Sequence, residues 1–243
     1  MCHGVDMVEP TSRAKSRAHI ERRIVELGRA HLARDGAAGL SLRAIARDLN
    51  MVSSAVYRYV ATRDQLLTLL VVDGYRELAA AVTDALAPAA DLSHRSRLHV
   101  ACNAFRGWAL AEPARYALLY GSPVPGYHAP ADQTVAPGTA VIALLLHELA
   151  AAHANGATVV APHRSAAVEA ALPFDAVRAE FAVELPDWLV ARAVGLWSGL
   201  VGAVSLEVFG QYGHDTFTRP ELLFQLLIDQ LLDGLLTDSV HTP

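Results

Sequence analysis

The chain has 243 residues, of which 53% are hydrophobic and 19% are charged, and this balance excludes a disordered protein. The net charge of -5 hides an asymmetry, because residues 1–63 carry eleven Lys and Arg against six Asp and Glu, whereas the remainder carries nine against nineteen. A basic first quarter on an acidic body indicates a polyanionic partner at the N-terminal end.

Two features favour a cytoplasmic protein with no membrane partner. The longest apolar run, 193–206, is shorter than the ~18 residues that a membrane span needs, and residues 1–15 lack the apolar core of a signal peptide.

Cys2 and Cys102 are the only cysteines, so a disulfide framework is not expected. We expect Cys102, in an apolar stretch, to be a small core residue rather than a sensor thiol.

The N-terminal segment is predicted to be a flexible basic tail, 1–15, followed by a helix over 16–35. Arg17, at the junction, can contact phosphates or a minor groove, and the alternative that it is only a solvated charge stays open. Gly36 follows as the residue that ends the helix. This helix is expected to brace the unit that comes next.

The stretch 39–67 is predicted to form two short helices joined by a tight turn, then the start of a third. Ser41 can cap the first helix, 42–49, through its hydroxyl. Asn50 follows, and asparagine is among the few residues besides glycine that tolerate a left-handed backbone. With a second helix at 53–59, opened by a serine, this is the helix-turn-helix arrangement that reads the DNA major groove.

The side chains expected to face outward from this unit suit DNA. Guanidinium, phenol and hydroxyl groups contact phosphates and base edges. The outward set is Arg43, Arg47, Tyr57, Arg58 and Arg63, with Ser53 and Ser54 at a helix start. A helical corner that only packs would have the same apolar pattern, but it would not need these outward charges.

The same stretch resembles the DNA-binding domain of the TetR family of bacterial transcription regulators. The resemblance is carried by IVELGRAHLARDGAAGL, LSLRAIARDL, SSAVYRYV and TRDQLL, and Asn50 departs from the glycine that the family usually has. It implies that helix 53–59 lies in the major groove of a palindromic double-stranded operator and that Arg63 holds a phosphate at a helix N-terminus. The predicted DNA-contact residues are Arg17, Ser41, Arg43, Ser53, Ser54, Ala55, Tyr57, Arg58, Tyr59 and Arg63.

The remainder is predicted to be a helical body. A long helix over 63–86 links it to the N-terminal unit, and further helices are expected at 96–111, 113–121, 139–154, near 173–181, 187–212 and 219–237. Four prolines make 121–137 an ordered loop rather than a helix. The expected fold is therefore all-α, with about nine helices. Its parts are a tail at 1–15, a three-helix DNA-binding domain at 16–62, and a ligand-binding and dimerisation domain at 63–243.

The two last helices are candidates for a dimer interface. Helix 187–212 contains four glycines, and each glycine inside a helix costs ~1 kcal/mol relative to alanine, so the close approach of another helix is the simplest compensation. Helix 219–237 is amphipathic and could instead only cover its own core. Given the family resemblance, we favour a homodimer held by a four-helix bundle of these two helices from each subunit.

A second, less specific resemblance concerns the body. The segment PARYALLYGSPVPGY and the WSG at 197–199 resemble a ligand domain named for a Trp-His-Gly motif, although Ser198 replaces the histidine. Aromatic residues can line a small-molecule pocket or fill a core, and as a set they suggest a small apolar or aromatic effector that releases a repressor from DNA. The predicted pocket residues are Phe105, Trp108, Tyr116, Tyr120, Tyr127, Leu145, Trp197 and Val201.

No catalytic residue, metal site or cofactor is expected. The histidine pairs His94/His99 and His147/His153 are five and six residues apart, whereas one helical face needs a spacing of three or four. Two alternatives to a regulator stay open. One is a small-molecule carrier or scaffold with a vestigial DNA-binding unit, and the other is a helical enzyme, against which the absence of a converging acid–base pair argues.

Overall fold

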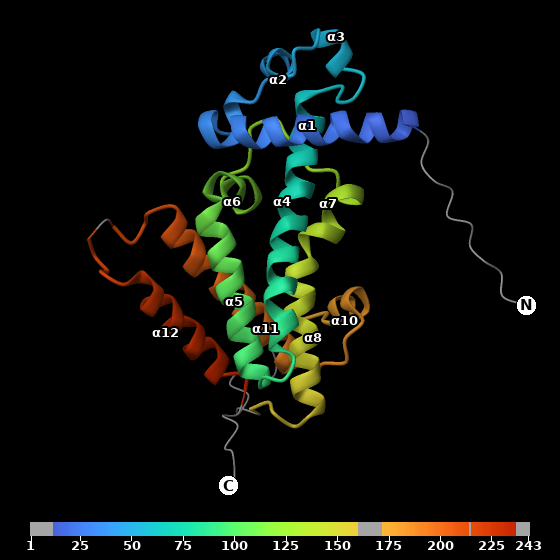
Figure 1. Cartoon of the computed structure of the whole chain (residues 1–243). Helices are drawn as coiled ribbons and strands as arrows, with labels where there is room; N and C mark the ends of the chain where they lie inside the picture. Colours follow the sequence, from blue (N-terminus) through green and yellow to red (C-terminus); the bar gives the residue numbers. More distant parts are fainter. Residues whose placement is uncertain (1–11, 160–171, 214, 237–243) are drawn as a thin grey trace, which may run out of the picture.

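The computed structural model describes residues 12–159, 172–213 and 215–236, and in this part of the chain every long element is a helix (Figure 1). An isolated antiparallel bridge joins Thr158 to Leu236. The α-helices are α1 (Ser12–Asp35), α2 (Leu42–Asp48), α3 (Ser53–Val56), α4 (Arg63–Leu86), α5 (His94–Ala111), α6 (Pro113–Tyr120), α7 (Ala131–Gly138), α8 (Ala140–Ala154), α10 (Asp175–Phe181), α11 (Asp187–Val208) and α12 (Pro220–Asp233). Short 3-10 turns, η1 (Ala37–Gly39) and η2 (Ala87–Ala89), follow α1 and α4.

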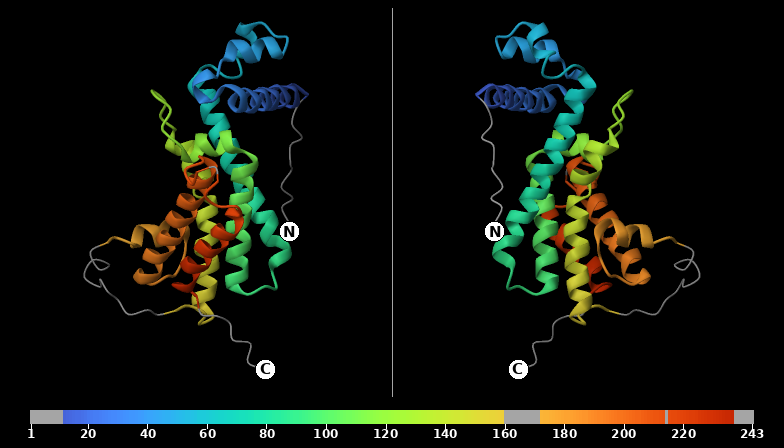
Figure 2. Two further views of the ribbon diagram at one scale, coloured as in Figure 1. Left: turned by 90° about the vertical axis from the view of Figure 1, so that its left-hand side faces the viewer. Right: turned by 90° about the vertical axis from the view of Figure 1, so that its right-hand side faces the viewer.

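Helix α4 is the axis of the molecule. Figure 1 shows α1 lying across one end of α4, with α2 and α3 beyond α1, while α5 to α8 contact the rest of α4 and α11 and α12 pack against α5. The side views show that α2 and α3 project away from the body (Figure 2). We call α1 to α3 with the first turns of α4 the head, and the rest the body.

Two hydrophobic cores lie along α4, one in the head and one in the body. Leu66, Leu67 and Leu70 of α4 are buried in the head core with residues of α1 to α3. Leu78 and Val82 of the same helix are buried in the body core with α5, α6, α8, α11 and α12. A continuous helix therefore supplies side chains to both cores.

Several predicted boundaries are shifted in the structure. Helix α1 begins at Ser12 rather than at residue 16, because Arg13, Ala14 and Lys15 are good helix formers that extend it; residues 1–11 of the expected tail lie outside the described residues. Helix α12 ends at Asp233 rather than at residue 237. Helix α4 has the predicted bounds.

Helix α11 ends at Val208, four residues before the predicted end. Gly210 has a φ of 66°, and the N–H groups of Gly210 and Gln211 donate to the carbonyls of Glu207 and Leu206. This is a Schellman cap, in which a left-handed residue just past the helix satisfies its last carbonyls. Gly210 therefore ends the helix instead of lying inside it.

The prediction that 121–137 is a loop is wrong for α7, which spans Ala131–Gly138. The helix begins directly after Pro130, and Pro137 falls in its last turn. Proline is tolerated before a helix and ends one that has already formed, because its ring clashes with the carbonyl four residues earlier. Helix α8 starts at a bend of 41° from α7, so the prolines bound a short helix and do not prevent it.

The helical glycines of α11 differ in their surroundings. A Cβ added to Gly199 would lie 2.6 Å from Leu231 Cδ1 of α12 in the same chain, so close packing within the subunit explains this glycine. Cβ atoms added to Gly195 and Gly202 would meet nothing within 4 Å. These two glycines therefore face open space in the single chain.

Cys102 is a buried core residue of α5, and burial raises the pKa of its thiol to about 12. A thiol is reactive as the thiolate, which is scarce at neutral pH when the pKa is this high. The described structure therefore supports the structural interpretation of Cys102 over the sensor interpretation.

Candidate nucleic-acid interface

The turn between α2 and α3 is built by its own sequence. The Ser41 hydroxyl accepts a hydrogen bond from the Ala44 N–H at 3.4 Å, which confirms the predicted cap. Asn50 has a φ of 55°, and the N–H of Met51 donates to the carbonyl of Ala46 at 2.9 Å. Asn50 thus supplies the left-handed residue that ends α2 and turns the chain into α3.

Two replacements of Asn50 should show whether its left-handed backbone or its side-chain contacts contribute to the stability of the protein. Asn50→Ala should lower the free energy of unfolding by about 1 kcal/mol, because a Cβ without a local polar partner disfavours the left-handed conformation, whereas Asn50→Gly should change it by less than about 0.5 kcal/mol. Asn103→Ala, at an exposed position inside α5, is the matched control and should not lower the stability, because alanine is the better helix former. Urea unfolding measures all three, and equal losses for Asn50→Ala and Asn50→Gly would contradict the assignment.

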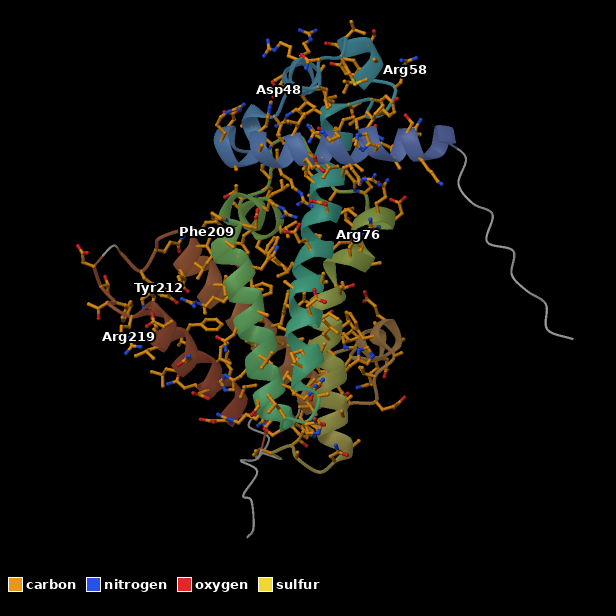
Figure 3. The ribbon with its side chains drawn as sticks, viewed as in Figure 1. Asp48, Arg58, Arg76, Phe209, Tyr212 and Arg219 are labelled. Atoms are coloured by element: carbon orange, nitrogen blue, oxygen red, sulfur yellow. The ribbon has the colours of Figure 1, made fainter. Side chains whose placement is uncertain are left out.

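Helix α3 and the two residues that follow it carry exposed side chains at the end of the head. Ser53 is its first helical residue, as predicted, with Val52 as an N-cap that makes no side-chain hydrogen bond, and the helix ends at Val56 rather than at residue 59. Tyr57, Arg58 and Ser54 are exposed. Figure 3 shows Arg58 at the free end of the head, on the side opposite the body.

The exposed cations of the head are available to a polyanion. Arg43, Arg47 and Arg58 are exposed, and none of them forms an ion pair with any residue that the structure describes. The acidic residue of α2, Asp48, is turned back toward α1, where its Oδ2 lies 2.6 Å from Nε2 of the buried His31. Positive charge therefore dominates this end, as phosphate binding requires.

Three predicted contact residues have partners within the head. Arg17 pairs with Glu21 at 2.8 Å, and its guanidinium lies 5.5 Å from the centre of the Tyr59 ring, which packs partly against the head core. Arg63 donates to the Ala37 carbonyl at 2.7 Å, so one of its nitrogens braces η1. Ala55 is half-buried on α3. The remaining predicted residues, Ser41, Arg43, Ser53, Ser54, Tyr57 and Arg58, lie on α2, α3 and their flanks.

A charged network joins the head to the body. Arg115 of α6, which is 4% exposed, donates to both carboxylate oxygens of Glu77 at 2.7 and 2.9 Å and to Asp73 at 3.1 Å. Arg29 of α1 makes two 2.6 Å hydrogen bonds to Asp73. The hydrogen bonds from Arg115 lower the pKa of Glu77 below its usual range. Helices α1, α4 and α6 thus meet at four side chains of alternating charge, Arg29, Asp73, Glu77 and Arg115. We call these four residues the junction network.

The predicted pocket aromatics mostly pack on one another. Phe105, Tyr120 and Trp197 have ring centres 5.7 to 6.2 Å apart at steep angles, the edge-to-face geometry of a packed cluster. The Tyr116 hydroxyl bonds to Ser205 on α11 at 2.9 Å. Trp108 and Leu145 are buried in the body core, and Val201 packs against that core.

A separate cavity of about 480 Å³ lies between α4, α6 and α7, and we call it the junction cavity. Tyr127 is the one predicted pocket residue that lines it, and the Tyr127 hydroxyl is 3.0 Å from Thr68 Oγ1 of α4. Its lining contains no charged side chain and consists of Val71, Tyr75, Leu118, Leu119, Gly121, Ser122, Pro123, Val124, Tyr127, Ala129, Thr134, Val135, Gly138 and Thr139.

Known proteins match both parts of the chain. Residues 98–231 match the family model for the tetracyclin repressor-like C-terminal domain. An HTH-type transcriptional regulator of Mycobacterium tuberculosis is 50% identical over 216 residues, covering 87% of this chain and 90% of that protein, and one of Mycobacterium bovis is equally similar.

Solved structures agree. The regulatory protein SCO4313 is 33% identical and superposes with a TM-score of 0.75, covering 92% of this chain and 100% of that one. A tetR-family transcription regulator from Shewanella sp. PV-4, 13% identical with a TM-score of 0.57, covers 90% of this chain and 98% of that one and shows the fold alone. With its exposed, cationic helix-turn-helix, the chain belongs to the TetR family of DNA-binding transcriptional regulators.

Proposed function

We propose that the protein is a homodimeric, non-enzymatic repressor of the cytoplasm that binds a palindromic operator through two copies of the head and is released by a small effector. Residues 16–62 would read the DNA, and 63–243 would bind the effector and the second subunit. The observation that carries the proposal is the exposure of three arginines without ion-pair partners among the described residues, Arg43 and Arg47 on α2 and Arg58 just after α3. Each head would read one half-site, about one helical turn from the other.

The dimer is supported by the uncovered apolar side of α11 and α12. Val194, Leu206, Leu222 and Leu226 are 45%, 38%, 44% and 54% exposed, although large apolar residues are usually covered when they gather on one surface. By length and composition, α11 is apolar enough to cross a membrane, yet one side of it packs in the body core. A second copy of α11 and α12 would cover the other side, where Gly195 and Gly202 leave room for a close approach.

We propose the junction cavity, rather than the aromatic cluster, as the effector site. Its uncharged lining with a few hydroxyl groups suits a neutral, largely apolar or aromatic molecule. Through Tyr127 and Thr68 it touches α4, the helix that carries the head. An effector that fits the cavity only when α4 is tilted would bind more tightly to the state in which the two heads are not spaced to match the operator. By stabilising that state, the effector would release the DNA.

Selection from random duplexes tests the operator proposal. The full-length protein should enrich an inverted repeat, and Arg58→Ala should weaken binding to that repeat by about five- to 150-fold, since a lost charged contact to a base costs about 1–3 kcal/mol. Arg34→Ala is the matched control, because Arg34 is also exposed but lies at the end of α1, paired with Asp35. A vestigial head predicts that no sequence is enriched, and that result would reject the proposal.

A further inference from the structure

The most exposed large apolar residue that the structure describes is on the DNA-reading head. Val52 is 71% exposed, whereas its neighbours in the turn and helix, Met51 and Val56, are half-buried and buried. A lone exposed valine needs no explanation on an ordinary surface. Val52, however, is the N-cap residue of α3, the helix that is proposed to enter the major groove.

Ala55 is the nearest small apolar residue to Val52 along α3. The Ala55 N–H donates to the Val52 carbonyl at 2.9 Å, which places the two residues within one turn of each other. Ser54, Tyr57 and Arg58 surround them with polar, exposed groups. Val52 is therefore an exposed apolar side chain in a stretch whose other exposed side chains carry hydrogen-bonding groups.

The DNA major groove has one apolar feature that such a side chain can recognise. Each base pair offers hydrogen-bond donors and acceptors at its edge, and thymine alone adds a C5-methyl group, which alanine and similar apolar groups contact. A phosphate would gain nothing from a valine. We propose that Val52, supported by Ala55, reads the C5-methyl group of one thymine in each operator half-site.

This inference rests on operator binding by the head, and single-position removal of methyl groups tests it. In the operator obtained by selection, each dT is replaced in turn by deoxyuridine, which deletes the methyl group and keeps every hydrogen-bonding group. We expect one position per half-site at which the wild-type protein binds about four- to tenfold more weakly, the effect of losing about one buried methyl group. Val52→Ala should bind the unmodified operator more weakly and lose its sensitivity at that position.

The matched control is Ser54→Ala, which removes a neighbouring polar group and should keep the sensitivity to deoxyuridine. Circular dichroism should show all variants folded, since Val52 supports no core contact. Wild-type protein that tolerates deoxyuridine at every position, or Val52→Ala protein that keeps the same loss, would overturn the inference while leaving operator binding intact. If no operator is enriched at all, the DNA-binding proposal itself fails, so the two failures are distinguishable.

Discussion

Replacing Arg115 by methionine should lower the free energy of unfolding by about 2–3 kcal/mol. Removing one partner of a buried ion pair costs about 3–5 kcal/mol, because the remaining charge stays buried without compensation. The lower figure applies here because Asp73 and Glu77 are 23% and 38% exposed and keep Arg29 as a partner. Methionine retains most of the volume, so the loss reports the charge rather than a cavity.

The measurement is urea unfolding at one fixed subunit concentration, because association would shift the apparent stability. Arg34→Met is the control, since Arg34 pairs with Asp35 at the exposed surface, where ion pairs contribute little to stability. Glu77→Gln in the Arg115→Met background should recover part of the loss by removing one uncompensated charge. An Arg115→Met variant within 0.5 kcal/mol of the parent would show that the junction network is not a stabilising element.

The double variant Leu222→Glu, Leu226→Glu should be monomeric and should bind the full operator at least about a hundredfold more weakly. Both leucines are exposed in the single chain, so a change to glutamate should cost the subunit itself little. In the proposed four-helix bundle, four glutamates would be buried without partners, and that is strongly unfavourable. Loss of the dimer removes the effective concentration of the second head at the second half-site.

Sedimentation gives the mass, and titration of a fluorescent operator gives the affinity. The matched control is Leu92→Glu, Leu110→Glu, which places two charges at leucines that are 50% and 40% exposed and lie outside α11 and α12. The control should stay dimeric and keep its affinity. If the α11–α12 surface is not the interface, both double variants will have the same mass and the same affinity as the parent.

The head could be predicted in detail because its signals are local. Ser41 caps the next turn, Asn50 adopts the left-handed backbone, and the Thr62 hydroxyl accepts from the Gln65 N–H at 3.0 Å. The Gln65 side chain in turn accepts from the Ala61 N–H, one residue before the N-cap Thr62. Each of these features depends on residues fewer than five positions apart, so the local sequence is enough to predict it.

The body was harder, because its decisive contacts join distant parts of the chain. The aromatic residues of α5, α6 and α11 suggested a pocket, but composition cannot tell whether Phe105 and Trp197 enclose a ligand or pack on each other. Gly199 fits against Leu231, while the similar Gly202 is open, and only the docking of α12 distinguishes them. The junction network also escaped prediction, because Arg29 and Arg115 are distant in sequence and meet through α4.

The shared role of α4 bears on how the chain could be divided. Leu70 belongs to the head core and Leu78 to the body core, and eight residues of helix advance only about 12 Å. A fragment ending at residue 62 would lack Leu66, Leu67 and Leu70, about a quarter of the head's buried apolar side chains. A cut at residue 62 would therefore leave the head without part of its own core, so the head and the body are not expected to fold independently when separated there.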